Sequence, residues 1–510
     1  MRGIDSSKTR LRHEVFVEVA RMAYEGTDLD KIDELPYKII PGEDAEYRAN
    51  VFIERAIVGE RIRAAMGLSV RNADEFGKIT DNIEASAIAE KYYEAPLINV
   101  IKFACNACPE KQVRVSDGCQ GCIEHPCKEV CPMHAISMVH GRSHIDQEKC
   151  VKCGKCVDAC QYHAIIKMER PCMKACGMGA IHSDDKGRAD IDYMKCVSCG
   201  QCLVNCPFGA IVDKGQIYQT ITAIKDANTP VYAIVAPAIA GQFKGLQNEK
   251  LAAAFKELGF TDMREVAIGA DLCTVEEAQD FIKEVPEKLP FMATSCCPAW
   301  SMMAKKMFPE QAKCISMALT PMVLTARLLK EKEPNCKIVF VGPCSAKKLE
   351  ASRRTIRSYV DFVLTFEEVA GMFEAKGVSF DFLPDDIDTL EKASADGRGF
   401  AAAGGVAAAV VKAAKRIDPN IEIKTMSADG LQNCRQMLQL AKAGKYNGYL
   451  LEGMACPGGC LSGAGTIAAL KNSTAALKAM QKEARFEEAY DTSYKERLAN
   501  LEKFELSEDY

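Results

Sequence analysis

The chain has 510 residues, 48% of them hydrophobic and 26% charged, and a formal net charge of −5. This length suits roughly three domains of about 150 residues each, and the charge gives no broad attraction to nucleic acid or anionic membranes. The sequence contains no apolar run of about 18 residues, the length that a membrane-spanning helix needs. The first residues form neither the apolar core of a signal peptide nor a twin-arginine pair. We therefore expect a cytoplasmic protein without a nucleic-acid or membrane partner.

Cysteine is the unusual component of this composition, with 25 residues. Disulfide frameworks are typical of short secreted chains, not of a chain of this length without an export signal. Metal binding in a reducing compartment is therefore the preferred interpretation of the cysteines.

Residues 1–95 contain no cysteine and have the pattern of helices. Apolar residues recur there at helical spacing, for example at Leu11, Val15, Val19 and Met22. This periodicity predicts a small helical N-terminal region that serves as a scaffold.

Residues 96–218 hold 16 cysteines in short segments separated by Gly and Pro, and we expect α+β ferredoxin-like 4Fe–4S modules there. The stretches 150–160 and 196–206 carry the uninterrupted spacing C-x-x-C-x-x-C-x-x-x-C. In this run three thiolates surround one 4Fe–4S cubane and the fourth reaches a neighbouring cluster. Zinc is the alternative, although a tetrahedral zinc site usually takes pairs of CxxC.

A third, slightly longer run at 119–131 pairs with the run at 150–160 to make a two-cluster unit at about 117–168. The run at 196–206 lacks such a partner, and the remaining cysteines lie on both sides of that unit. We infer that one two-cluster unit is nested in another and that four clusters relay electrons. The predicted ligand sets are Cys119, Cys122, Cys127 and Cys160, and Cys131, Cys150, Cys153 and Cys156, in the inner unit; and Cys105, Cys108, Cys172 and Cys206, and Cys176, Cys196, Cys199 and Cys202, in the outer unit.

The split outer unit leaves one alternative open, in which Cys105 and Cys108 bind something else or nothing. The crossing of ligands between runs follows from the known ferredoxin pattern. By itself this region describes only an electron carrier.

Residues 219–470 have the pattern of an α/β domain, with mixed sheets flanked by helices. Apolar runs at 231–236, 338–342 and 361–365 predict buried strands, and 251–258, 275–285 and 405–414 predict helices. The charged residues 471–510 predict a helical C-terminal tail.

Three cysteine segments in this domain read TSCCPAW at 294–300, GPCSAKK at 342–348 and EGMACPGGC at 452–460. Adjacent cysteines in an extended loop point to opposite sides, so Cys296 and Cys297 should have different functions. The glycines between Cys456 and Cys460 allow the backbone to approach an inorganic group closely. The segments indicate a fifth cluster with one additional free thiol.

These segments resemble the three signature motifs of the FeFe hydrogenases, and with the ferredoxin region the resemblance covers about residues 100–470. It implies an iron hydrogenase that reversibly interconverts protons, electrons and H2 in anaerobic metabolism. The implied cofactor is an H-cluster, in which a 4Fe–4S cubane joins a diiron centre carrying CO, cyanide and azadithiolate. A ferredoxin or similar small carrier and hydrogenase maturation proteins are the implied partners.

The resemblance also implies a role for individual residues. Cys297, Cys344, Cys456 and Cys460 would hold the cubane, and Cys460 would be the bridge to the diiron unit.

Three further residues of the motifs would act beside the diiron unit. Cys296 resembles the thiol that passes protons to the azadithiolate, Lys347 would donate a hydrogen bond to a cyanide, and Met454 would pack nearby. A thiol with a pKa of about 8.5 exchanges protons near neutrality more readily than a serine hydroxyl. The alternatives are an inert buried thiol and a solvated lysine.

The segment 269–278 resembles the family's proton-relay segment. By that resemblance Glu277 and Asp280 are the relay carboxylates, three residues apart on one helix face. Ser316 would link Cys296 to Glu277. The alternative is that these are solvated acids on a helix surface.

The sequence departs from the best-known enzymes of the family in the surroundings of the site. Gly342 stands where a methionine is usual, Ala407 replaces a second bulky methionine and Ala299 replaces a glycine. The chain therefore resembles a divergent branch, group B, and its potential, direction and oxygen tolerance stay open. Four cysteines, Cys273, Cys314, Cys336 and Cys434, are expected to be small buried hydrophobes.

Two other functions compete with the hydrogenase prediction. One is a non-catalytic relative that keeps the cubane and serves in cluster assembly, and the other is a hydrogen sensor. The cysteine at position 296, Lys347 and Glu277 favour hydrogen chemistry, because a non-catalytic protein needs no proton relay.

Overall fold

Two parallel sheets form the centre of the largest part of the molecule, which a computed structural model describes for residues 3–353, 356, 359–385 and 393–500. The first sheet has the strand order β10-β9-β12-β13 and the second has the order β11-β15-β14. The strands are β9 (Val231–Val235), β10 (Asp262–Glu265), β12 (Lys337–Gly342), β13 (Phe362–Thr365), β11 (Met292–Ala293), β14 (Lys424–Asp429) and β15 (Tyr449–Met454).

The expected α/β character is present, but the expectation of mixed sheets is wrong for these strands. Every pair within the two sheets is parallel. Helical crossovers return the chain to the same end of a sheet, which makes successive strands run in one direction. All five residues of β9 are buried, as expected for a strand covered on both faces.

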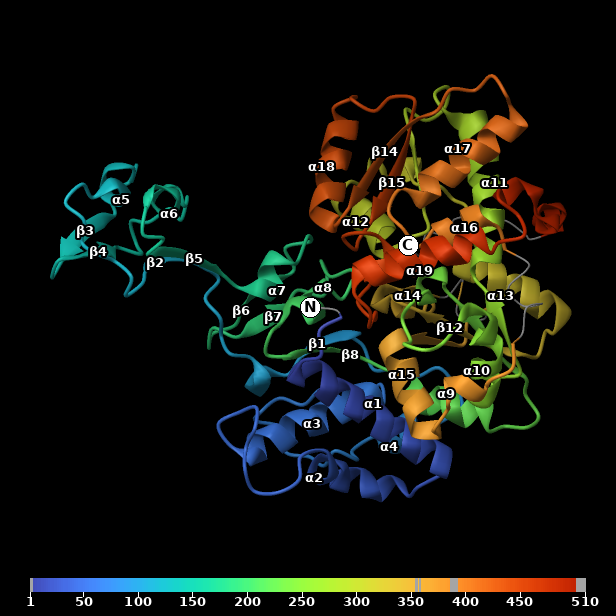
Figure 1. The fold of residues 1–510 in the computed structure, drawn as a ribbon, viewed down its shortest axis with the longest axis horizontal. Helices are drawn as coiled ribbons and strands as arrows, with labels where there is room; N and C mark the ends of the chain where they lie inside the picture. Colours follow the sequence, from blue (N-terminus) through green and yellow to red (C-terminus); the bar gives the residue numbers. More distant parts are fainter. Residues whose placement is uncertain (1–2, 354–355, 357–358, 386–392, 501–510) are drawn as a thin grey trace.

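Helices alternate with the strands through this body (Figure 1). The predicted helix at 275–285 begins earlier than expected, at Ala267, because Ala267–Thr274 continue the buried face. The helices are α9 (Ile217–Ile224), α10 (Leu251–Glu257), α11 (Ala267–Glu284), α12 (Pro298–Met307), α13 (Pro321–Lys332), α14 (Ser345–Glu350), α15 (Phe366–Lys376), α16 (Ala395–Gly399), α17 (Gly405–Ile417), α18 (Leu431–Lys442) and α19 (Leu470–Lys482).

The N-terminal helices share a hydrophobic core with the first sheet. Val15 and Val19 of α1 belong to the same buried cluster as Val339 of β12. A Cβ added to Gly371 of α15 would lie 2.7 Å from Phe16 Cβ, so glycine permits the close approach of α1. The helices are α1 (Ser7–Glu25), α2 (Leu35–Ile39), α3 (Val51–Ala65) and α4 (Ile83–Ser86).

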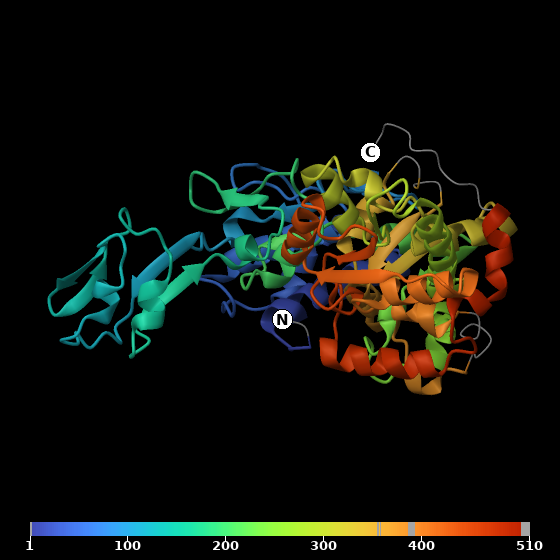
Figure 2. The ribbon, with the colours of Figure 1, turned by 90° about the horizontal axis from the view of Figure 1, so that it is seen from above.

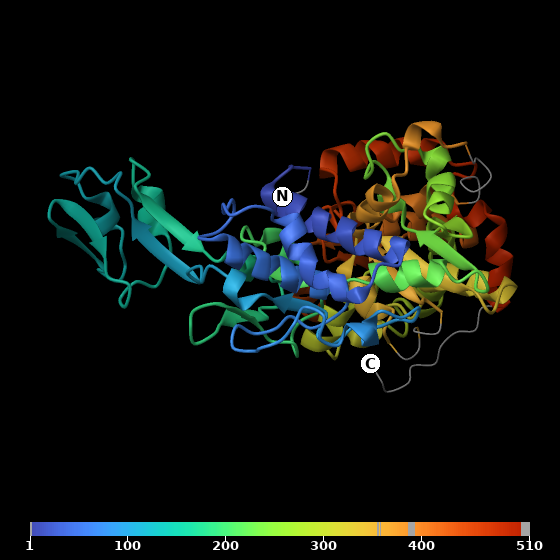
Figure 3. The same ribbon diagram turned by 90° about the horizontal axis from the view of Figure 1, so that it is seen from below.

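The cysteine-rich region has two parts. One part, the base, packs on the body that holds the two parallel sheets. The other part, the arm (residues 116–164), projects away from the body (Figure 1). The arm leaves through an antiparallel pair of strands in which Lys111 faces Glu169 and Val115 faces Ile165. Figures 2 and 3 show the arm standing clear of the body from above and from below. The pairs are β2 (Lys111–Val115) with β5 (Ile165–Glu169), β3 (Ile136–Val139) with β4 (Arg142–Ile145), β6 (Ile181–Ser183) with β7 (Ala189–Ile191), and β1 (Ile98–Val100) with β8 (Ile211–Asp213).

Short helices lie within the cysteine segments, namely α5 (Pro126–Glu129), α6 (Lys155–Ala159), α7 (Pro171–Lys174) and α8 (Gln201–Asn205). The described helices include none that is both long enough and apolar enough to cross a membrane.

A buried charge network joins the cysteine-rich base to the body that holds the two parallel sheets. Lys348 of α14 lies 3.2 Å from Asp213 of β8 and 3.0 Å from Glu368 of α15. Its side chain is 2% exposed, and Arg12 of α1 also pairs with Asp213 at 2.7 Å.

Replacing Lys348 with methionine should destabilise the protein by about 3–5 kcal/mol, because it leaves two carboxylates buried without their shared cation. Lys442→Met provides the control, because Lys442 pairs with Glu310 on the exposed surface and should cost less than about 1 kcal/mol. Denaturant unfolding of both variants measures the difference. Equal losses would show that the network contributes no special stability.

Candidate active site

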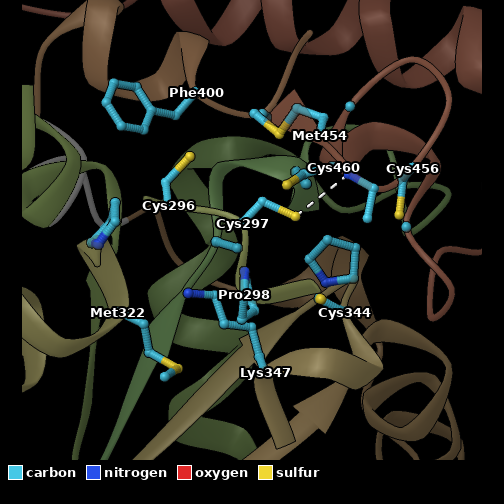
Figure 4. A pocket seen from close by; sticks show the side chains of 18 of the residues that line it. Cys296, Cys297, Pro298, Met322, Cys344, Lys347, Phe400, Met454, Cys456 and Cys460 are labelled. Carbon is cyan, nitrogen blue, oxygen red and sulfur yellow. Dashed lines mark hydrogen bonds between the residues drawn. The ribbon is translucent and has the colours of Figure 1, made fainter. Parts of the chain in front are cut away.

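Three strand ends bring the cysteines of the α/β domain to one cavity. Cys297 follows β11 and begins α12, Cys344 follows β12 and begins α14, and Cys456 and Cys460 follow β15. All four line the same cavity, which Figure 4 shows. Residues from distant segments converge here because the carboxyl ends of parallel strands form a common edge.

Cys296 and Cys297 point in different directions from one loop. In Figure 4 the Cys297 sulfur lies on the side of Cys460 and Cys456, whereas the Cys296 sulfur points toward Phe400. The backbone N–H of Ala455 donates to Cys297 Sγ at 3.5 Å. Burial raises the pKa of Cys296 well above its ordinary value. Cys296 is therefore a protonated thiol on the wall of the cavity.

The four other thiols repel one another when they are ionised. Burial raises the pKa of Cys344 to about 12, and the charges of Cys456 and Cys297 add to this rise. Burial and the same kind of neighbours also raise the pKa of Cys460. Such thiols lose their protons when they bind a metal, because the metal replaces the proton on sulfur. The donor set therefore fits an iron–sulfur group bound through thiolates.

Lys347 supplies a positive charge at the edge of this cavity. Its Nζ lies 2.7 Å from Glu350 Oε2, and Thr320 Oγ1 donates to Glu350 Oε1 at 2.7 Å. This ion pair uses only part of the donor capacity of the ammonium, which has three N–H donors. Lys347 therefore keeps donors available for an anionic group in the cavity, which Met454 also lines.

Glu277 is a completely buried carboxyl group on α11. Burial raises its pKa to about 7, while hydrogen bonds from Ser295 and Ser316 lower it. Ser295 N–H donates to Glu277 Oε1 at 3.1 Å, and Oε2 has no partner among the described residues. The charge of Glu277 in turn raises the pKa of Cys296, so the two groups lie close enough to interact.

The remaining residues of this route also lie on or beside α11. Asp280 is half-buried, three residues after Glu277. Cys273 is fully buried one turn before Glu277, and burial, Glu277 and Cys296 raise its pKa. Cys273 therefore adjoins the predicted relay, as its sequence position in the segment 269–278 indicates.

The ferredoxin region has two cavities whose cysteines correspond to predicted ligand sets. One lies on the arm and the other lies at the base, and both are walled by cysteines from different runs. The arm cavity is lined by Cys131, Cys150, Cys153 and Cys156, and the base cavity by Cys105, Cys108, Cys172 and Cys206.

Contacts relate some of the cysteines of the other two predicted sets. The charges of Cys199, Cys196 and Cys176 raise the pKa of Cys202 after burial. On the arm Ser143 hydrogen-bonds with Cys127 at 3.3 Å and lowers the pKa of Cys119. Cys160 packs with Cys127 in one cluster; Cys122 lies on the same arm. Among the described residues no group of three or more His, Cys, Asp or Glu is arranged to hold a single metal ion.

The cysteine run at 196–206 reaches the candidate active-site cavity at Gly200 and Gln201. A Cβ on Gly200 would lie 2.4 Å from Ala464 Cβ, and Gly200 has φ +74°, which glycine adopts without strain. Cys199 lines the cavity itself. Gln201 Nε2 donates to Cys456 Sγ at 3.3 Å. This direct contact links a predicted cluster ligand loop to a predicted cubane ligand.

Sequence reasoning missed the roles of Ser295, Glu350 and Gln201. Ser295 adjoins Cys296 and Gln201 lies within a cysteine run, and these positions were the only available signals. The expected default for the other cysteines agrees with the structure, because Cys314, Cys336 and Cys434 are all buried.

Models of known protein families match three stretches of the chain. Residues 229–464 match the family described as iron only hydrogenase large subunit, C-terminal domain. Residues 143–166 match a 4Fe-4S binding domain, and residues 170–210 match a 4Fe-4S dicluster domain.

Similar proteins fall into two groups. Iron hydrogenase 1 of Clostridium pasteurianum is 29% identical over 63% of this chain and 64% of its own length. The NADP-reducing hydrogenase subunit HndD of Solidesulfovibrio fructosivorans is 28% identical over 50% of this chain and 53% of its own. The cytosolic Fe-S cluster assembly factor narfl of Xenopus tropicalis is 30% identical over 43% and 57%. The chain thus spans less than two thirds of these three relatives.

Among solved structures, the FeFe-hydrogenase HydA1 from Chlamydomonas reinhardtii is 21% identical with a TM-score of 0.46. The match covers 54% of this chain and 91% of that one.

Proposed function

Because the chain is an FeFe-hydrogenase-like protein with ferredoxin-type 4Fe–4S domains, we propose that it catalyses the reversible interconversion of protons, electrons and H2. The observation that carries this proposal is one cavity lined by four converging cysteines together with Cys296 and Lys347. A structural cluster alone requires four ligands, and it requires neither a fifth thiol nor a buried ammonium.

Cys297, Cys344, Cys456 and Cys460 would hold the cubane of an H-cluster, and Cys460 would connect it to the diiron unit. When bound, the H-cluster would supply the redox-active site at which protons are reduced with electrons from the carrier, or at which H2 is split. Lys347, whose pairing with Glu350 leaves N–H donors unused, would hydrogen-bond to a cyanide. Met454, which lines the same cavity, would pack beside the diiron unit.

Cys296 and Glu277 would move protons between the cavity and solvent. Cys296 holds its proton because burial raises its pKa, and Glu277 has a pKa of about 7. A carboxyl group with a pKa near neutrality both accepts and releases protons efficiently. Ser295 and Ser316 orient this carboxyl group, and the half-buried Asp280 continues the route outward.

Electrons would pass along the four predicted clusters from the arm to the cavity. Gln201 and Cys199 support a direct last step, because both lie against the cavity cysteines. We propose a ferredoxin or similar carrier as the partner, hydrogenase maturation proteins for assembly, and a cytoplasmic location.

The second candidate is a role in iron–sulfur cluster assembly. The similarity to the assembly factor of Xenopus tropicalis favours it. The two functions separate in one assay, in which matured protein receives a chemically reduced viologen dye. A hydrogenase evolves H2, whereas iron-loaded, matured protein that evolves none would give the assembly role precedence.

Removing the arm tests the nesting of the clusters. Deleting residues 116–164 and joining Val115 to Ile165 through Asn-Gly closes the β2–β5 hairpin with a favoured two-residue turn. The protein should lose about eight irons, those of two 4Fe–4S clusters, and should still turn over with the dye. Cys153→Ser in the full chain is the control and should affect one cluster at most. Loss of all iron would contradict the nested arrangement.

A further inference from the structure

A second large cavity lies between α1, the ferredoxin base and the segment that leads into α19. Its volume is about 790 Å³, within the range of about 300–1,000 Å³ typical of small-molecule sites. Figures 1 and 3 show the start of the chain beside the first turn of α19, where Gly3 N–H donates to Ile467 O at 2.9 Å. None of the cysteines discussed above lines it.

Positive side chains dominate the charged part of its wall. The carboxylates are already paired, Asp5 with Arg10 at 3.2 Å and Glu367 with Arg12 at 2.9 Å. His13 pairs with Glu374. The cationic residues that line the cavity are Lys8, Arg10, Arg12, Arg61 and Lys244.

Three of these cations, Lys8, Arg61 and Lys244, have no carboxylate within ion-pair distance in the part of the chain that the structure describes. Lys8 Nζ donates instead to the carbonyl oxygens of Val204 at 3.0 Å and Cys206 at 3.2 Å. Burial lowers the pKa of Lys8. Lys244 is exposed and lines the same cavity.

Arg61 is the most informative of the three. It is 7% exposed, its Nη2 donates to Gly209 O at 2.6 Å, and its Nε has no partner among the described residues. Burial and the charges of Arg12 and Arg48 lower its pKa to about 10. A buried guanidinium with an unused donor is costly, and an anion in the cavity would offset that cost through a charge-assisted hydrogen bond.

The rest of the wall suits an organic body. Leu203, Ile211, Phe243 and Ile467 contribute apolar surface around the cations. We propose that this cavity binds a phosphate-bearing organic molecule of nucleotide size, with its phosphates on Lys8, Arg61 and Lys244. The proposal does not depend on hydrogen chemistry at the other cavity.

Calorimetric titration of the iron-loaded full chain with ATP, pyrophosphate and adenosine tests the proposal. ATP should bind more tightly than either of the other probes, because only ATP supplies both the phosphates and the body. Lys244→Glu should weaken ATP binding at least about tenfold through charge repulsion, and Lys8→Glu should do the same. Lys415→Glu, on the exposed end of α17, should leave it within about twofold.

The proposal is overturned if ATP does not bind, or if adenosine or pyrophosphate binds as tightly as ATP. It is also overturned if Lys244→Glu and Lys415→Glu bind ATP equally well. Lys244 is exposed, so its replacement keeps the test valid even if Lys8→Glu disturbs the adjoining loop at Cys206.

Discussion

Replacing Cys296 with alanine should lower hydrogen turnover by about 10²–10⁴-fold, the usual contribution of a positioned proton donor. The clusters should stay in place, because the Cys296 sulfur points toward Phe400 and away from the Cys297 side of the cavity. Dye-coupled H2 evolution measures the loss, and iron content with cluster absorbance measures the integrity of the site. Cys296→Ser should retain little activity, because a hydroxyl exchanges protons poorly near neutrality.

Cys336→Ala is the control, since Cys336 is a buried thiol, 2% exposed, that belongs to the core of the first sheet and does not line the cavity. Its turnover per loaded protein should equal that of the parent chain. Full turnover in Cys296→Ala would exclude Cys296 from the proton route. Loss of iron in Cys296→Ala would instead make it a ligand.

Replacing Glu277 with glutamine should lower turnover by about 10²-fold or more, because the amide cannot accept the proton. The substitution is nearly isosteric, so the hydrogen bond from Ser295 N–H is preserved. Glu277→Asp should recover part of the activity. Turnover equal to that of the parent chain would remove Glu277 from the relay.

The same substitution has a distinct signature in stability. The folded pKa of Glu277, about 7, lies above the unfolded value of 4.5, so the folded state binds more protons between these pH values. Stability therefore falls as pH rises from about 4.5 to 7, by roughly 3 kcal/mol from this group alone. In Glu277→Gln this component should vanish, which unfolding at pH 5 and pH 8 measures. An unchanged pH dependence would show that Glu277 ionises normally.

Most of the predicted cluster ligands were identified from local sequence motifs. The cysteine runs predict their clusters through short spacing, which the chain keeps in any fold. The split set that joins Cys105 and Cys108 to Cys172 required accounting for every cysteine in the region. Those residues line one cavity in the structure, because the β2–β5 hairpin returns the chain to its starting point after the arm.

Other features depended on tertiary contacts and were not predictable. The parallel direction of both sheets arises from helical crossovers, which the apolar strand runs do not reveal. Gln201 gains its contact with Cys456 only when the cysteine-rich base meets the α/β body. Glu350 and Ser295 acquire their roles in the same way, by facing Lys347 and Glu277.

The central claim is that this cavity receives a diiron unit and performs hydrogen chemistry. The most direct measurement is the infrared spectrum of protein that has been matured with its diiron cofactor. The account predicts bands from bound CO and cyanide together with H2 evolution. A matured, iron-loaded protein with neither CO and cyanide bands nor H2 evolution would contradict it.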